Sequence, residues 1–167
     1  GSIDILINNA GTASDSKFEN MTLDQWHTVQ RVNIDSVFIM CKLAYPNMIE
    51  KKWGRIVNIG SMNGQAGQVN QVNYVSSKAA MHGFTKALAL EAAKHGITVN
   101  TIAPGYVDTY LISKMPDRIM KKILDASPVN RLGLEMEVAH AVLYLIDEKS
   151  AWMTGSTLSM NGGTHMY

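Results

Sequence analysis

The chain has 167 residues, of which 46% are hydrophobic and 17% charged, and its formal net charge at pH 7 is +1. This length suits one globular domain with a real core, so we expect residues 1–167 to form a single domain. A net charge this close to zero gives no electrostatic reason to expect nucleic acid or a membrane surface as a partner. No apolar run approaches the ~20 residues needed to span a bilayer, and no signal peptide opens the chain.

Cys41 is the only cysteine, so an internal disulfide is excluded and a reducing, cytoplasmic compartment is favoured. It follows the apolar run 37–40, so we expect a buried structural thiol rather than a nucleophile. The histidines are far apart and show no spacing typical of metal ligands, so no metal site is expected. They are His27, His82, His95, His140 and His165.

Strand signals occur four times along the chain. Short runs rich in apolar and β-branched residues cover 3–7, 55–59, 97–102 and, more weakly, 156–159. Most of them are near-continuous apolar runs, which is typical of strands buried on both faces. We therefore expect four strands of one sheet.

Helical signals fill the intervals between these runs. Thr22 and Gln25 have the spacing of a capping box. The helix that they begin should run towards Lys52, with a break near Asn33 or Pro46.

A second long helix is expected at about 72–95, ending at Gly96, with shorter helices at about 116–126 and 135–147. Strands that alternate with helices, joined by right-handed crossovers, form a parallel sheet covered on both faces. The predicted fold class is therefore α/β, with a doubly wound parallel sheet.

Ligands in such sheets bind beyond the carboxyl ends of the strands. Three stretches directly follow predicted strands and should gather at one edge of the sheet. They are Asn-Asn-Ala-Gly at 8–11, Gly-Ser-Met at 60–62 and Pro-Gly-Tyr at 104–106.

Tyr74 and Lys78 are four residues apart in a predicted helix, so the phenol and the ammonium share a face. A free tyrosine titrates near 10. A positive charge ~4 Å away is worth roughly 4 kcal/mol at an effective dielectric of 20. That interaction would lower the phenol pKa by up to about 3 pH units, into the range useful for general acid/base catalysis. Ser61 could donate a hydrogen bond to a substrate carbonyl.

The tyrosine–lysine spacing alone is weak evidence, because Tyr110 and Lys114 repeat it. Thirteen residues before Tyr110 lies Ile97, whereas Ser61 lies thirteen residues before Tyr74. We therefore interpret Tyr110 and Lys114 as a chance pair in a loop that enters a helix.

Together these features resemble the short-chain dehydrogenase/reductase family, over essentially the whole chain. The matching residues are the Asn-Asn-Ala-Gly stretch, Asn33, Ser61, Tyr74, Lys78, Pro104-Gly105 and Asn161-Gly162-Gly163. The resemblance implies a Rossmann-like fold in which Tyr74 donates a proton to a carbonyl during reduction. It implies that Lys78 lowers the pKa of Tyr74 and holds the nicotinamide ribose, that Ser61 positions the carbonyl, and that Asn33 anchors a water of a proton relay.

The same resemblance implies a nicotinamide cofactor, with NADP(H) expected and NAD(H) possible. The residues that it assigns to cofactor binding are Asn9, Ala10, Gly11, Tyr74, Lys78, Pro104, Gly105 and Val107.

Within the family, residues 63–74, 104–106 and 161–166 resemble the acetoacetyl-CoA reductases. This implies that Gln68, Gln71 and Tyr106, with Ser61, contact an acetoacetyl thioester, within polyhydroxyalkanoate synthesis. The alternative interpretation is that the glutamines solvate a loop, which we favour for Gln65 alone. The alternative substrate is a 3-oxoacyl group on acyl carrier protein.

The family's phosphate-binding pattern, Thr-Gly-x-x-x-Gly-x-Gly, does not occur in the 167 residues, which begin where the family's fourth strand is expected. We therefore expect a truncated domain that does not by itself bind the cofactor's pyrophosphate. The run 3–8 should present an open apolar strand edge. The long helices should support a homo-oligomer, either a dimer or a tetramer. Two hypotheses follow: a 3-oxoacyl-thioester reductase, or a non-catalytic remnant that folds and oligomerises.

Overall fold

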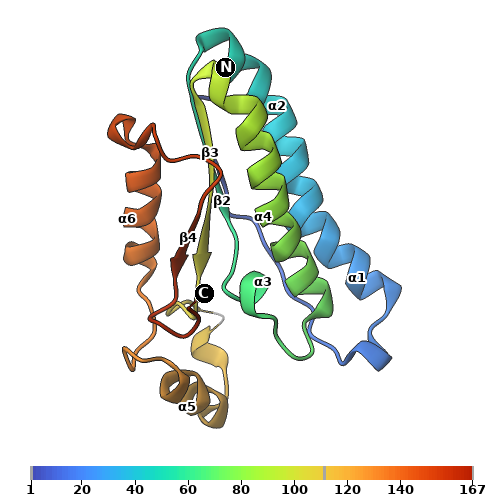
Figure 1. The fold of residues 1–167 in the computed structure, drawn as a ribbon. Helices are drawn as coiled ribbons and strands as arrows, with labels where there is room; N and C mark the ends of the chain where they lie inside the picture. The colour runs from blue at the N-terminus through green and yellow to red at the C-terminus, as the bar shows by residue number, and fades with distance from the viewer. Residues whose placement is uncertain (1, 111, 167) are drawn as a thin grey trace.

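The structure is a computed structural model that describes residues 2–110 and 112–166. Its centre is a parallel sheet of four strands in the order β1-β2-β3-β4 (Figure 1). The strands are Ile5–Asn8 (β1), Gly54–Ile59 (β2), Ile97–Pro104 (β3) and Thr157–Met160 (β4). The α/β class and the four predicted strands are thus confirmed.

Helices cover both faces of this sheet (Figure 1). Helices α2 (Ser36–Lys51) and α4 (Val72–Ala92) lie on one face, and α6 (Glu135–Ile146) lies on the other. The larger hydrophobic cluster lies under α2 and α4, and the smaller one lies under α6. The larger cluster includes Val37, Cys41, Met48, Ile56, Met81 and Val99, and the smaller one Val57, Ile102, Ala141 and Leu145. The expected burial of Cys41 is confirmed, and burial raises the pKa of its thiol to about 11.

The first helical region has three parts. Helix α1 (Leu23–Gln30) begins with the predicted capping box, in which Thr22 and Gln25 each cap the other's backbone. A π-helical turn, Arg31–Asp35, then leads into α2. The expected break at Asn33 is therefore confirmed as this π turn.

The alternative break at Pro46 is wrong, because α2 continues through this residue. Proline in a helix leaves the carbonyl four residues earlier without its amide donor. Pro46 lies on the exposed side of α2, where water can satisfy that carbonyl.

The other helices agree with the expected ranges. Helix α4 passes into a 3-10 turn, Ala93–His95, and the chain reverses at Gly96, whose φ is +69°. A side chain at Gly96 would collide with the Lys52 carbonyl oxygen, so this position needs glycine for both its φ and its space. Helices α3 (Asn63–Ala66) and α5 (Asp117–Ala126) lie near the carboxyl ends of the strands (Figure 1).

Strand β1 forms one edge of the sheet that the described residues build. Its inner residues, Leu6 and Asn8, are buried, but Ile5 is 41% exposed and Ile7 37% exposed. Among the described strands β1 pairs only with β2, so within these residues its outer edge carries exposed apolar side chains, as expected for the run 3–8.

Within residues 2–110 and 112–166, no helix combines the length and the apolar character needed to cross a membrane.

Candidate active site

The three stretches that follow strands meet at one end of the sheet, as predicted. The Met62 amide donates to the Pro104 carbonyl at 2.8 Å, which ties the end of β2 to the end of β3. A Cβ placed on Gly11 would lie 3.5 Å from Lys78 Nζ and 3.6 Å from Asn33 Oδ1. The loop after β1 therefore passes directly over the lysine of α4.

Ser61 and Tyr74 face each other across this end of the sheet. The Ser61 hydroxyl lies near enough to the Tyr74 phenol for a hydrogen-bond contribution that lowers the pKa of the phenol, and Ser61 Oγ accepts from the Asn63 amide at 3.1 Å. Tyr74 lies in the first turn of α4, where its amide donates to Asn73 Oδ1 at 2.8 Å. The predicted serine–tyrosine pair is thus brought together by β2 and α4.

Lys78 lies one turn further along α4, and its side chain is buried. Its Nζ donates to the Ile59 carbonyl at 2.7 Å and lies 5.8 Å from the centroid of the Tyr74 ring. Burial lowers the pKa of Lys78 to about 8.

The predicted lowering of the Tyr74 pKa is wrong for this structure. The pKa of Tyr74 is raised, first by burial, with smaller contributions from Asp15 and Tyr106, while the Ser61 hydrogen bond opposes the rise. The physical reason is that the ammonium is directed to the Ile59 carbonyl, so burial decides the sign.

Asn33 lies in the π turn and is fully buried. Its amide nitrogen donates to the Thr12 carbonyl at 2.9 Å and to Ser77 Oγ at 3.0 Å, and its Oδ1 accepts from the Thr12 amide at 2.8 Å. Both amide hydrogens are thus used in fixing the loop after β1 to α4. The role of Asn33 in holding a water of a proton relay stays a prediction.

A polar chain lies beside Tyr74. Asn63 Nδ2 donates to Gln71 Oε1 at 3.0 Å, and Gln71 Nε2 donates to both carboxylate oxygens of Asp15 at 3.0 Å. The Asp15 carboxylate raises the pKa of both Tyr74 and Tyr106. The sequence analysis missed Asp15, whose only signal is its place in the loop after β1.

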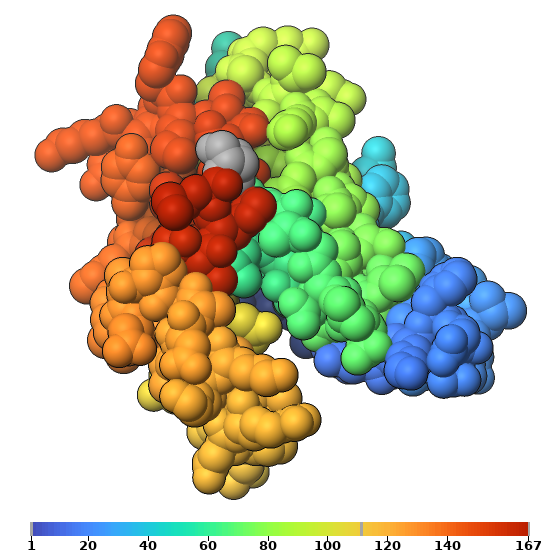
Figure 2. Space-filling view, turned by 60° about the horizontal axis from the view of Figure 1, so that its bottom comes forward, coloured from blue at the N-terminus to red at the C-terminus, as the bar shows by residue number. Residues whose placement is uncertain are grey.

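The predicted substrate contacts are thus partly brought together. Gln71 and Tyr106 lie near Tyr74 and Asp15, whereas Gln68 is exposed on the loop that precedes α4. The lobe around α5 (orange) and the N-terminal lobe (blue) stand on either side of an open notch (Figure 2).

Comparison with known proteins agrees with this geometry. A family model described as enoyl-(acyl carrier protein) reductase matches residues 1–165. The chain is 46% identical over 166 residues to an acetoacetyl-CoA reductase of Cupriavidus necator, covering 99% of this chain and 68% of that protein. It is 46% identical over 165 residues to the 3-oxoacyl-[acyl-carrier-protein] reductase FabG of Buchnera aphidicola, covering 99% of this chain and 68% of that protein.

The chain belongs to the short-chain dehydrogenase/reductase family. It is therefore an oxidoreductase by family, and the family uses an NAD(P)-type nucleotide cofactor.

The residues present fit the nicotinamide half of such a cofactor in this short-chain dehydrogenase/reductase. Gly11 leaves free the space beside Lys78 Nζ and Asn33 that a side chain would fill. Pro104-Gly105 extends from β3 at the same end of the sheet, and Gly105 is packed closely against Asn161. The glycine-rich turn that would hold the pyrophosphate does not occur in the 167 residues.

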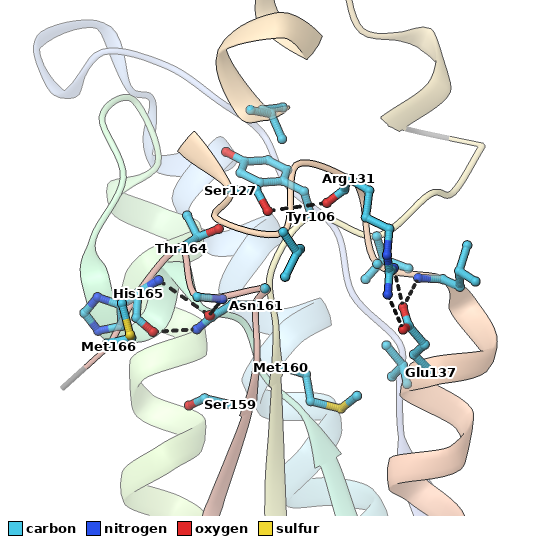
Figure 3. Close-up of a pocket in the computed structure, with 18 residues that line it drawn as sticks. Tyr106, Ser127, Arg131, Glu137, Ser159, Met160, Asn161, Thr164, His165 and Met166 are labelled. Atoms are coloured by element: carbon cyan, nitrogen blue, oxygen red, sulfur yellow. Dashed lines mark hydrogen bonds and ion pairs between the residues drawn. The ribbon is translucent and has the colours of Figure 1, made fainter. Parts of the chain in front are cut away.

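A cavity of about 530 Å³ lies next to this centre (Figure 3). Its lining includes Tyr106 and Val107 from the end of β3, and Asn161–Met166 from the chain that follows β4. Arg131 and Glu137 form a two-bond ion pair at its rim, at 2.7 and 2.9 Å. The cavity therefore shares Tyr106 with the predicted substrate contacts but does not include Ser61, Tyr74 or Lys78.

The Tyr110–Lys114 pair and Gln65, which we did not assign to the active site, lie outside it. Lys114 Nζ lies 4.9 Å from the ring centroid of Tyr110, but this tyrosine is 75% exposed. The expectation that Gln65 solvates a loop is wrong, because this residue lies in α3 and exchanges hydrogen bonds with Ser159 at 3.2 Å, which ties α3 to β4.

Proposed function

We propose that this short-chain dehydrogenase/reductase reduces a 3-oxoacyl thioester to the 3-hydroxyacyl thioester, with acetoacetyl-CoA as its substrate. The observation that carries the proposal is that the Ser61 hydroxyl lies beside the half-buried Tyr74 phenol, one helical turn before Lys78 on α4. This pair places two hydroxyl groups around one point, where a substrate carbonyl oxygen would lie.

Tyr74 acts as the general acid in the proposed reaction. A reduced nicotinamide, when bound, supplies the hydride to the carbonyl carbon. The negative charge that develops on the carbonyl oxygen is stabilised by the Ser61 hydroxyl, and Tyr74 transfers its proton to that oxygen. A raised pKa keeps Tyr74 protonated at pH 7 before the reaction, which suits an acid.

Lys78 supports this transfer as a cation. With a pKa of about 8 it is mostly charged at pH 7, although it is buried. Lys78 would hold the ribose hydroxyls of the cofactor, and its positive charge would stabilise the phenolate. Asn33 holds the loop after β1 against α4 and so fixes the floor of this site.

The proposed substrate contacts are Gln71, Tyr106 and the exposed Gln68. Acetoacetyl-CoA is favoured because the relatives from Cupriavidus necator and Acinetobacter, the latter 45% identical over 167 residues, carry that name. Acyl carrier protein is the alternative carrier, after the relative from Buchnera aphidicola. NADP(H) is proposed over NAD(H) as the cofactor.

A second candidate function is a non-catalytic subunit that oligomerises. Its support is the apolar surface of α2, where Phe38, Ile39 and Leu43 are 56%, 52% and 67% exposed. Exposed apolar groups on one helix favour a protein interface, and a second copy of this single-domain chain is the proposed partner.

Binding and turnover test these candidates separately. Acetoacetyl-CoA titrated into the ¹⁵N-labelled chain should shift the amides of Ser61, Gln71 and Tyr106. Because the 167 residues lack the glycine-rich turn, we expect little or no NADPH-dependent reduction by the purified chain. Robust turnover that is lost in Tyr74→Phe would contradict that expectation and support the reductase. Neither binding nor turnover, with either carrier, would favour the non-catalytic subunit.

A further inference from the structure

His82 packs behind the predicted site. It follows Lys78 by four residues, so the two side chains share a face of α4. Its Nδ1 lies 3.0 Å from Thr157 Oγ1 on β4. Its Cε1 lies 3.5 Å from the position that a Cβ would take on Gly60. The imidazole therefore fills the space between β4 and the segment Gly60–Ser61.

The Gly60–Ser61 segment is confined on its other sides as well. The Gly60 amide donates to the Ile102 carbonyl at 2.7 Å, and a Cβ on Gly60 would approach Thr101 Cγ2 to 2.8 Å. A side chain at Gly60 would thus collide with β3. The bare backbone at this residue is what allows the histidine ring to lie against it.

The charge state of the ring follows from its surroundings. Burial is the main cause that lowers the pKa of His82, and Lys86 and Lys78 lower it further, while the backbone of Ser61 acts in the opposite direction. The ring is therefore neutral at pH 7. Its Nε2 is buried and has no hydrogen-bond partner of regular geometry among the described residues, although the Ser61 backbone lies near enough to the ring to raise its pKa.

We propose that His82 is a positioning residue that holds Ser61 where its hydroxyl reaches the Tyr74 phenol. It acts through the backbone of Gly60 and Ser61 and touches neither substrate nor cofactor. The contact between Nδ1 and the Thr157 hydroxyl ties the ring to β4 in either tautomer. The use of Ser61 in catalysis rests on the proposed function, but the positioning itself does not.

Three variants and one control test this role without any substrate. His82→Leu keeps the bulk and removes both nitrogens, and His82→Gln restores a donor and an acceptor. Thr157→Val removes the partner on β4. His140→Leu, at an exposed residue of α6, is the matched control.

Amide hydrogen exchange and amide chemical shifts are the measurements. The Asn63 amide donates to Ser61 Oγ, so its proton shift reports the position of the hydroxyl. In His82→Leu we expect the Asn63 proton shift to change. We also expect the Gly60 and Asn63 amides to exchange roughly tenfold faster, because this segment opens locally more often without the ring. Val57 in the middle of β2 should keep its rate, and His82→Gln should restore most of the wild-type behaviour.

Two results would overturn the proposal. One is an unchanged Asn63 shift and unchanged exchange at Gly60 in His82→Leu. The other is equal acceleration at Gly60 and Val57, which would show that only global stability changed. If His82→Leu does not fold, Thr157→Val should give the same local pattern, and the ¹⁵N shifts of the His82 ring should change because the ring loses its partner on β4. Unaltered ring ¹⁵N shifts and unaltered Gly60 exchange in Thr157→Val would then contradict the proposal.

Discussion

The Lys78 ammonium is directed to the Ile59 carbonyl, 2.7 Å away, and its Nζ lies 5.8 Å from the ring centroid of Tyr74. The two side chains share a face of α4, yet the charge is held by the end of β2. In this state the pKa of the Tyr74 phenol is raised, and burial lowers the pKa of Lys78. The position of the ammonium therefore bears on the pH dependence of stability and on the titration of Tyr74.

Stability should increase with pH through the titration of Lys78. Its pKa in the folded chain is about 8, below the ordinary lysine value of 10.5, so the unfolded chain binds more protons between these values. The penalty for burying the charge is therefore complete below about pH 8 and is relieved as the pH rises to about 10.5. Relative to Lys78→Met, the wild-type chain should gain about 2–4 kcal/mol of unfolding free energy across this interval.

Urea unfolding at a series of pH values measures this gain. Lys42→Met, at an exposed position of α2, is the control and should leave the pH dependence unchanged. A wild-type curve parallel to that of Lys78→Met would show that Lys78 is not desolvated.

The Tyr74 phenol should titrate above 10, and Ser61→Ala should raise its pKa further. Burial raises this pKa and the Ser61 hydrogen bond opposes the rise, so removal of the hydroxyl leaves burial unopposed. Tyrosine ¹³Cζ shifts followed against pH, with Tyr74→Phe for assignment, measure the change. A Tyr74 pKa below 10 would contradict the structure.

How much of the site could be predicted depends on what periodicity encodes. The spacing of Tyr74 and Lys78 places them on one helical face, and Ser61 follows a buried strand, so all three were expected together. Periodicity does not encode depth or the direction of a long side chain, which is why the sign of the Tyr74 shift was wrong. Asp15 was missed because a loop has no period, and only its hydrogen bonds to Gln71 reveal its place.

The fold likewise has elements that the sequence pattern predicts and features that it does not. Strand β3 and the end of α4 were predictable because a buried apolar run and Gly96 leave few alternatives. Strand β1 carries a similar apolar run, but its exposure depends on its neighbours in the sheet, which a single run does not specify. The effect of Pro46 depends likewise on which face of α2 reaches water.

A buried polar chain beneath the site should contribute strongly to stability. Asn8 Nδ2 donates to Asn58 Oδ1 at 2.8 Å, Asn58 Nδ2 donates to Thr85 Oγ1 at 2.9 Å, and Thr85 Oγ1 lies 2.7 Å from Thr101 Oγ1. Thr85→Val keeps the shape but leaves groups on both sides without a partner. We expect a loss of about 1–3 kcal/mol in unfolding free energy.

Chemical denaturation of Thr85→Val measures this loss, with Thr28→Val on the exposed side of α1 as the matched control. The double variant Thr85→Val/Thr101→Val should recover part of the loss, because it also removes the orphaned hydroxyl. Equal losses of unfolding free energy at Thr85 and Thr28 would mean that the buried hydrogen-bond chain adds nothing to stability beyond helix propensity.

The open edge of β1 should drive self-association of the chain. Ile5 and Ile7 project apolar side chains from a strand whose outer edge is unpaired among the described residues, and such edges pair with other chains. Ile5→Lys and Ile7→Lys should each reduce association in sedimentation velocity, because a charged side chain at an edge opposes strand pairing. Val69→Lys, at a residue that is 80% exposed in a loop, controls for added charge. If Leu43→Lys abolishes association and the two β1 variants do not, the contact is made by α2 and the prediction for β1 is wrong.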